Sequence, residues 1–247
     1  MEFSLQQDAS QLDTASSVIL PLADLTGGIS TLTTDSLKAA DNLLSGAISH
    51  AIASGDLSSK FKSSQLFLNA GPGPDRILVI GTGTPEQLSG RKYRQLVQAA
   101  WSQISSNPGH SVLNQLTTAD TKSLDLNSKV RLTVEALVQA CYRFDQFKTN
   151  NKNIVPIPNM VLLAQTSSQA QLDQSTATAQ AMDLCRDLGN LPGNVCTPSF
   201  LAEQGHKLAA GSDKVITQVL EEAEMESLGM HSLLSVGKGS AEPSKLI

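Results

Sequence analysis

The chain has 247 residues, of which 40% are hydrophobic and 17% charged, so it can bury a substantial core. Its net charge of -5 at pH 7 gives no global electrostatic reason to expect nucleic acid as a partner: residues 1–150 carry 12 basic against 13 acidic side chains, and residues 151–247 carry 6 against 10. No signal peptide is evident, and no apolar stretch approaches the ~20 residues of a membrane span, so we expect a soluble, cytoplasmic protein.

Apolar runs typical of strands alternate with helical periodicity over the first two thirds of the chain. The expected strands are residues 18–22, 65–68, 76–80, 111–113 and 160–164, and the expected helices are residues 36–55, 93–104 and about 128–141. Pro21 favours a sheet edge or a strand end, and Asp35 or Ser36 is expected to cap the first helix. Residues 71–74 form a predicted turn, and residues 154–158 form an irregular link. The alternation predicts an α/β domain with a mostly parallel sheet.

A change in composition marks the best domain boundary. Residues 165–180 are rich in Gln, Ser, Thr and Ala, and we interpret them as a loop leading into a linking helix that ends near Gly189. In the unit that follows, Thr197 is expected to cap a helix that starts at Pro198, and Gly229 to end a short acidic helix. Strands are expected at residues 215–220 and 233–236. The predicted domains are an N-terminal α/β domain over residues 1–165, a linker helix over 166–190 and a second unit from 191.

Two glycine-rich segments invite a nucleotide interpretation. Gly81-Thr-Gly83 follows a strand and precedes a helix, where backbone amides can face a phosphate. The dinucleotide fingerprint needs a further Gly where Glu86 stands, so we favour a tight turn and discount a nucleotide-dependent oxidoreductase. The loop of residues 237–240 lacks the P-loop pattern, because Ser232 occupies the place of its first Gly and Pro243 interrupts the helix that should follow.

The metal-binding and nucleophilic residue types are scattered. The histidines stand singly and are expected to have surface or capping roles: His50, His110, His206 and His231. The cysteines fit neither a zinc pattern nor a disulfide framework and are expected to be buried, inert thiols: Cys141, Cys185 and Cys196. Glu221, Glu222, Glu224 and Glu226 are expected to form a solvated helix face. These patterns alone identify no reaction.

Two segments near the C-terminus resemble the leucyl aminopeptidases of the cytosol aminopeptidase family. Residues 186–203 contain an Asn-x-Pro-x-Asn turn before a capped helix, formed by Asn190, Pro192, Asn194, Thr197 and Pro198. Residues 225–240 are similar to a second signature, a Leu-Gly-Met turn followed by a strand and a Gly-x-Gly-Ser loop. Upstream, the opening Met-Glu-Phe and residues 76–81, 91–94 and 144–149 resemble the N-terminal domain of bacterial members.

The resemblance implies a peptidase that removes N-terminal residues from peptides, with leucine favoured. It implies two divalent metal ions, manganese or zinc, and a homo-hexamer in the cytoplasm. Some bacterial members also bind DNA and act in transcription control and recombination. The main alternative is therefore a DNA-binding or oligomerisation module.

The resemblance places the family's metal ligands, which are a lysine, aspartates and a glutamate, after the Gly-x-Gly-Ser loop and beyond Lys245-Leu-Ile247. Lys238 belongs to the earlier loop and is not assigned as a ligand. No catalytic, metal or binding residue is therefore assigned. Residues 191–247 are expected to be the truncated start of a catalytic domain, and we expect the 247 residues alone to be inactive and to bind no metal.

Overall fold

The structure, a computed structural model, describes the whole chain except residues 24–31, 33, 150–155 and 157. Within the described residues, six strands form one sheet in the order β1-β6-β5-β2-β4-β3. The strands are β1 (Phe3–Gln6), β2 (Ser17–Leu22), β3 (Ser64–Leu68), β4 (Arg76–Gly81), β5 (Ser111–Asn114) and β6 (Asn159–Leu163). The β3–β4 pairing is antiparallel, and the other pairings are parallel. The predicted α/β fold with a mostly parallel sheet is confirmed.

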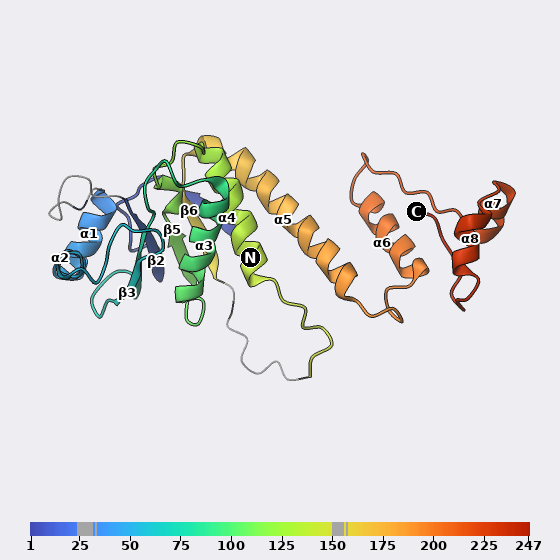
Figure 1. Cartoon of the computed structure of the whole chain (residues 1–247), viewed down its shortest axis with the longest axis horizontal. Coiled ribbons are helices and arrows are strands. Elements are labelled where there is room, and N and C mark those ends of the chain that lie inside the picture. The colour runs from blue at the N-terminus through green and yellow to red at the C-terminus, as the bar shows by residue number, and fades with distance from the viewer. Residues whose placement is uncertain (24–31, 33, 150–155, 157) are drawn as a thin grey trace. The chain divides into compact units, whose positions relative to one another are not determined.

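Helices cover both faces of the sheet (Figure 1). The helices of this region are α1 (Asp35–Leu43), α2 (Ala47–Ser54), α3 (Gly90–Ile104), α4 (Leu126–Cys141) and α5 (Gln169–Asn190). Helices α1 and α2 pack on one face, and α3 and α4 pack on the other. In β4, Ile77 and Val79 face α1 and α2, whereas Leu78 and Ile80 face α3 and α4. This two-sided burial explains the uninterrupted apolar run of β4.

Pro21 lies in β2, a central strand between β5 and β4, so the expectation of a sheet edge is wrong and that of a strand end is right. The carbonyl of Ile19 accepts a hydrogen bond from the amide of Gln115 on the β5 side, at 3.0 Å. The carbonyl of Leu22 accepts from Thr82 on the β4 side, also at 3.0 Å. Alternation along the strand therefore turns Pro21 toward β5, past the end of that ladder, where its missing N–H breaks no sheet pairing.

The helix predicted over residues 36–55 is two helices, α1 and α2. Ser45 and Gly46 have φ values of 53° and 86°, which end α1 and redirect the chain. The buried Asp41 stabilises the break, because its carboxylate accepts hydrogen bonds from the amide and the hydroxyl of Ser49 in the first turn of α2. The cap of α1 is Thr34, one residue before the two candidates.

The predicted linking helix is α5, which ends at Asn190, one residue after the expected Gly189. The loop before it is shorter than predicted, because α5 already begins at Gln169. Leu172 and Ala179 are seven residues apart and are buried on one side of this helix. Hydroxyl groups on the helix return hydrogen bonds to the carbonyls four residues earlier, as Ser175 does at 2.6 Å and Thr178 at 2.9 Å. These hydrogen bonds explain how residues 165–180 can be helical although they are rich in Ser and Thr.

The sequence patterns do not predict strand β1, and the predicted link at 154–158 lies mostly outside the described residues.

The chain divides into two compact units, residues 1–183 and 184–247, and the division falls within α5. The expected domain limits at 165 and 190 stay a prediction. The second unit contains α6 (Pro198–Ala210), α7 (Glu222–Ser227) and α8 (His231–Gly237). Thr197 caps α6 as predicted, and Gly229 follows the acidic helix with φ 74°.

The two strands predicted in the second unit are wrong. In residues 215–220, only Leu220 is paired, in an isolated bridge with Leu246. Residues 233–236 lie inside α8. A short apolar run suits a strand or a helix equally well, and a helix satisfies its own backbone groups where no partner strand is available.

Candidate functional site

The glycine-rich turn after β4 uses its backbone amides within the protein. The amides of Gly81, Thr82 and Gly83 donate hydrogen bonds to the carbonyls of Ser63, Leu22 and Ser59, at 2.7, 3.0 and 2.8 Å. A Cβ atom on Gly81 would lie 2.6 Å from the carbonyl oxygen of Ser58, so the glycine is needed for a close backbone approach. The tight-turn interpretation is confirmed, and these three amides are not available to hold a phosphate.

The glycine-rich loop near the C-terminus is also structural. Gly237 ends α8 instead of preceding a helix, and Lys238 is exposed at the C-terminal end of that helix. A side chain at Gly237 would overlap the hydroxyl of Ser244. Nearby, the ammonium group of Lys245 lies 2.6 Å from one carboxylate oxygen of Glu221. The loop therefore packs the chain end against α7 and does not have the geometry of a P-loop.

The described residues do not fit the metal ions that the resemblance implies. Across these residues, no three His, Cys, Asp or Glu side chains come together in a way that could hold an ion. The four histidines are all exposed, as expected. Glu221, Glu222 and Glu224 are engaged at the start of α7, where Glu224 accepts a hydrogen bond from the amide of Glu221 and Glu222 accepts one from the amide of Ser244. We therefore derive no metal-dependent step from these residues.

The cysteines differ from the prediction of buried thiols. Cys185 is exposed on α5, while Cys141 and Cys196 are partly buried, and all three are free. Burial raises the pKa of the Cys141 thiol to about 11, so it is protonated at neutral pH and is a poor nucleophile. Cys185 is exposed because the buried residues of α5, which are Leu172, Ser175 and Ala179, all lie in the first half of the helix.

Two hollows lie at the surface of the N-terminal unit. One has a volume of about 250 Å³ and lies where α3 and α4 end, with Trp101, Cys141 and Arg143 in its lining. The other, of about 570 Å³, lies beside α1 and includes Leu43 and Asp13. Neither lining contains a pair of carboxylates or a nucleophile beside a base, so neither has the groups of a hydrolytic centre.

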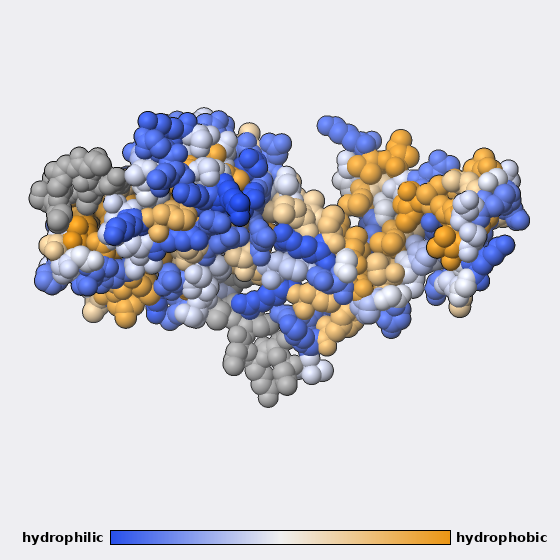
Figure 2. Space-filling view, in the orientation of Figure 1, coloured by the Kyte–Doolittle hydropathy of each residue, from blue (hydrophilic) through white to orange (hydrophobic). Residues whose placement is uncertain are grey.

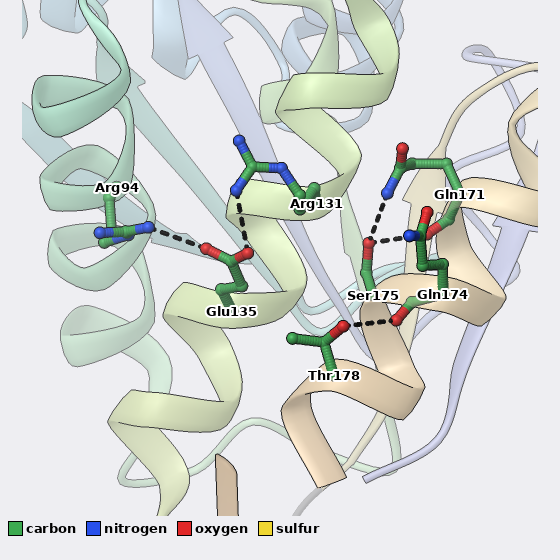
Figure 3. A network of polar contacts seen from close by, with 7 residues as sticks. All are labelled: Arg94, Arg131, Glu135, Gln171, Gln174, Ser175 and Thr178. Carbon is green, nitrogen blue, oxygen red and sulfur yellow. Dashed lines mark hydrogen bonds and ion pairs between the residues drawn. The ribbon is translucent and has the colours of Figure 1, made fainter. Parts of the chain in front are cut away.

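Glu135 on α4 forms ion pairs with two arginines (Figure 3). Its carboxylate lies 2.8 Å from the guanidinium of Arg94 on α3 and 3.0 Å from that of Arg131 one turn away on α4. The other residues drawn, Gln171, Gln174, Ser175 and Thr178, form hydrogen bonds along α5. Sequence reasoning missed the Arg94–Glu135 pair, because the partners are far apart in the chain. The network links helices and is not a reaction centre.

Family models identify both parts of the chain. The N-terminal domain of the cytosol aminopeptidase family matches residues 29–151, and the catalytic domain of the same family matches residues 183–247. Together these matches cover well over half of the sequence, in the family's order. The chain belongs to the cytosol aminopeptidase family. The resemblance is thereby confirmed. The motifs, which follow one another in the family's order, identified the family, whereas the scattered histidines and cysteines did not.

Curated relatives agree with this membership. The cytosol aminopeptidase of Pseudomonas aeruginosa strain PAO1 is 37% identical over 218 residues, which are 86% of this chain and 44% of the relative. A probable cytosol aminopeptidase of Stutzerimonas stutzeri is 32% identical over 255 residues, covering 100% of this chain and 50% of the relative. The chain therefore spans about half the length of the curated relatives it matches.

Two solved structures share the fold of this chain. A mutant of tomato leucine aminopeptidase matches with a TM-score of 0.78 and 21% identity, over 99% of this chain and 49% of that one. The bottromycin maturation enzyme BotP in complex with Mn matches with a TM-score of 0.69 and 22% identity, over 93% of this chain and 43% of that one. At these identities, the likeness establishes the fold of this chain and says nothing about the reaction it takes part in.

The turn that opens the second unit is built as its motif predicts. Asn190 is the last residue of α5, and the amides of Val195 and Cys196 both donate to the carbonyl of Pro192, at 2.8 and 2.9 Å. The hydroxyl of Thr197 then accepts a hydrogen bond from the amide of Phe200 at 3.2 Å. This family motif therefore fixes the backbone at the start of α6.

In the described part of the protein, no helix has the length and apolar character to cross a membrane.

Proposed function

We propose that the chain forms the N-terminal domain and the beginning of the catalytic domain of an aminopeptidase that removes N-terminal residues from peptides, with leucine favoured. The observation that carries this proposal is the collinear match of both family models, at residues 29–151 and 183–247. The names of the curated relatives support the peptidase activity and a cytosolic location. The substrate preference follows from the resemblance of residues 186–203 and 225–240.

The surface of the second unit supports its assignment as part of a larger domain. Figure 2 shows hydrophobic side chains over this unit. Ile216 is 93% exposed and Val236 is 85% exposed, whereas the buried apolar side chains of the unit are Ala202 and Met225. Such apolar exposure is typical of a surface that another part of a protein covers. We infer that the remainder of the catalytic domain packs against these residues.

The proposed activity of the complete protein requires two divalent ions, manganese or zinc. The described residues offer no group that fits them. We propose that their ligands lie in the part of the catalytic domain that the longer relatives contain in addition. The greater length of the relatives supports this placement. The 247 residues alone are therefore expected to bind no metal at such a site and to be inactive.

Mass spectrometry combined with a peptidase assay tests the proposal. The intact mass first establishes whether the sample is the 26.1 kDa chain. That chain is expected to leave leucine anilide intact with added Mn²⁺ or Zn²⁺, while a longer polypeptide that includes the rest of the catalytic domain is expected to hydrolyse it. Hydrolysis by the pure 26.1 kDa chain would overturn the predicted inactivity. An inactive, folded and metal-loaded longer polypeptide would contradict the aminopeptidase assignment.

The alternative is a module for oligomerisation or DNA contact. One observation favours oligomerisation. Strand β3 is at the edge of the sheet and contains neither a charged residue nor a proline. Leu66 and Leu68 are 36% and 71% exposed. Uncharged edge strands of this kind readily pair with another chain, and we propose that β3 contributes to the homo-hexamer.

Sedimentation velocity measures this contribution. Leu68→Lys is expected to shift the protein toward smaller species, because a charge on the open edge opposes pairing. Leu43→Lys, at an exposed apolar position of α1, serves as the control and is expected to leave the distribution unchanged. Equal distributions for all three proteins would exclude a role of β3 in assembly.

A further inference from the structure

The larger hollow, beside α1, has three walls from separate parts of the N-terminal unit. One wall is α1, the second is formed by residues 10–13 between β1 and β2, and the third is the turn of residues 72–73 between β3 and β4. Its volume of about 570 Å³ is in the range of pockets that hold small ligands. The hollow therefore suits a molecule of several bonded groups and not a single ion.

The two walls outside α1 are held in place by bonds within the protein. The side-chain amide of Gln6 donates a hydrogen bond to the carbonyl of Gln11 at 2.9 Å, and the next residue, Leu12, is buried in the core. In the turn, the side-chain amide of Asn69 donates to the carbonyl of Pro72 at 3.0 Å. The hollow therefore has its shape before a ligand arrives, which reduces the entropy lost on binding.

Part of the lining is apolar. Ala39 and Leu43 are four residues apart and therefore share one face of α1, and Leu12 and Pro72 add apolar surface from the other two walls. The side chain of Leu43 contacts the turn, where one of its methyl carbons lies 3.6 Å from the position of a Cβ atom on Gly73, yet the residue is 40% exposed. An aliphatic side chain placed in the hollow would cover this leucine.

The polar part of the lining has unused bonding capacity. The carboxylate of Asp13 and the side-chain amides of Gln11 and Asn42 form no hydrogen bond or ion pair with any described residue. Among the described residues that line the hollow, none is a lysine or an arginine. The lining is therefore negatively charged, and its two amides offer both donors and acceptors.

These groups together match the N-terminus of a peptide. The carboxylate of Asp13 attracts an ammonium group, and the amides of Gln11 and Asn42 complement the N–H and C=O of a peptide bond. The apolar walls accommodate an aliphatic first side chain. A free amino acid or another anionic ligand fits less well, because its own negative charge would approach Asp13 with no basic side chain in the described lining to balance it.

We propose that this hollow binds the N-terminal residue of a peptide whose first side chain is aliphatic. The choice of a peptide rests on the proposed function, because an aminopeptidase acts on free N-termini. The lining contains one carboxylate and no nucleophile beside a base, so the hollow holds the peptide without cleaving it. The N-terminal unit thereby carries a peptide-binding site of its own, separate from the reaction centre.

A nuclear magnetic resonance titration of the 247-residue protein tests the site. We expect the peptide Leu-Gly-Gly to bind saturably and to shift the backbone amide signals of residues 10–13, Asn42 and Leu43. N-acetyl-Leu-Gly-Gly lacks the ammonium group and Gly-Gly-Gly lacks the side chain, so each is expected to bind at least about threefold more weakly. No saturable binding of Leu-Gly-Gly, or equal binding of the three peptides, would overturn the proposal.

Matched variants separate the local site from net charge. Asp13→Asn removes the charge but keeps the shape of the side chain, and we expect it to weaken Leu-Gly-Gly about threefold and to leave N-acetyl-Leu-Gly-Gly unchanged. Asp173→Asn removes the same charge from α5, outside the lining, and is expected to bind like the unaltered protein. Leu43→Ala is expected to reduce the preference for Leu-Gly-Gly over Gly-Gly-Gly. Circular dichroism establishes that each variant is folded, and equal weakening by Asp13→Asn and Asp173→Asn would contradict the site.

Two comparisons distinguish this site from other roles of the protein. If a second copy of the chain covers the hollow, Leu43→Lys shifts sedimentation toward smaller species and Leu-Gly-Gly does not bind, which would overturn the proposal. Hydrolysis of leucine anilide by the longer polypeptide is measured separately. Loss of that reaction with peptide binding retained contradicts only the proposed function, whereas hydrolysis without peptide binding at the hollow contradicts only this site.

Discussion

Gly81 links two segments at the scale of a single residue. Its missing side chain lets the backbone of residues 58–60 approach β4, and its amide and carbonyl both form hydrogen bonds with the loop of residues 58–63. Gly81→Ala is expected to lower the free energy of unfolding by about 3 kcal/mol or more, because the added methyl group would overlap backbone atoms that cannot rotate away. Urea denaturation measures this loss.

A second glycine provides the control for Gly81. At Gly71, an added methyl group meets only the side chain of Asn69 at 3.4 Å, and Gly71→Ala is expected to change stability by less than about 0.5 kcal/mol. Equal effects of the two substitutions would show that close backbone approach at Gly81 does not limit the fold.

Asp125 makes the start of α4 sensitive to pH. Its carboxylate accepts a hydrogen bond from the amide of Ser128 at 2.7 Å, and hydrogen bonding by Ser128 holds the pKa of Asp125 below its usual value. A lowered folded-state pKa contributes stability above the unfolded pKa of ~3.9, and this stability is lost as the pH falls through the lowered value. Asp125→Ala is therefore expected to be less stable than the unaltered protein at pH 7, with a smaller difference at pH 2.

Urea denaturation of both proteins between pH 7 and pH 2 measures how this difference changes. Asp125→Asn keeps a capping oxygen but does not titrate, so we expect its stability relative to Asp125→Ala to vary little with pH. A constant difference between the unaltered protein and Asp125→Ala over the whole range would contradict the role of ionised Asp125.

At the scale of elements, α3 and α4 are joined by polar bonds as well as by apolar packing. Tyr93 on α3 is fully buried and its hydroxyl lies 2.9 Å from that of Thr133 on α4, and burial raises the pKa of Tyr93 far above its usual value, so it stays protonated. The second bond is the ion pair of Arg94 with Glu135, whose side chain is only 15% exposed. The pair therefore sits at the margin of the helix contact.

Glu135→Gln removes the charge that two arginines share. We expect it to lower the free energy of unfolding by about 1 kcal/mol, because Arg94 loses its ionic partner next to the core. Arg131→Ala removes only the more exposed pair within α4 and is expected to cost a few tenths of a kcal/mol. Chemical denaturation compares the two variants, and an equal loss in both would place the important interaction within α4 instead of between the helices.

At the scale of the whole molecule, the two units differ in how they are stabilised. Among the residues that the structure describes, the three buried hydrophobic clusters all lie within residues 1–183, whereas the second unit buries Ala202 and Met225. Hydrophobic burial is the main favourable contribution to folding. The two units are therefore expected to differ in stability, with the N-terminal unit the more stable.

A chain shortened to residues 1–183 is expected to melt within about 5 °C of the 247-residue chain, because it retains the complete sheet and its helices. Differential scanning calorimetry provides the comparison. Hydrogen exchange on the longer chain is expected to be faster in α7 and α8 than in β4. A large fall in melting temperature on shortening would show that the second unit stabilises the first.

Local sequence patterns determined the elements that bury a long or strongly periodic apolar surface. The four apolar residues 77–80 specified β4, and the spacing of Tyr93, Leu96, Val97, Ala100 and Trp101 specified α3, because such patterns are satisfied by one backbone conformation. Thr197 and Pro198 likewise specified the start of α6 through bonds made within one turn. The family motifs, which are also continuous in sequence, identified the cytosol aminopeptidase family.

Only the tertiary structure decided features that depend on residues distant in the chain. The pairing of β1 with β6 joins residues about 150 positions apart, and no local sequence pattern predicts it. The strands expected at 215–220 and 233–236 found no neighbouring strand among the described residues, so the first run has no regular structure apart from one bridge and the second is a helix. The meeting of Lys62 and Lys92 on Phe61 was equally invisible, because it requires the loop and α3 to be brought together by the sheet. Local bonds can be read from neighbouring residues, whereas these contacts form only when the fold supplies the partner.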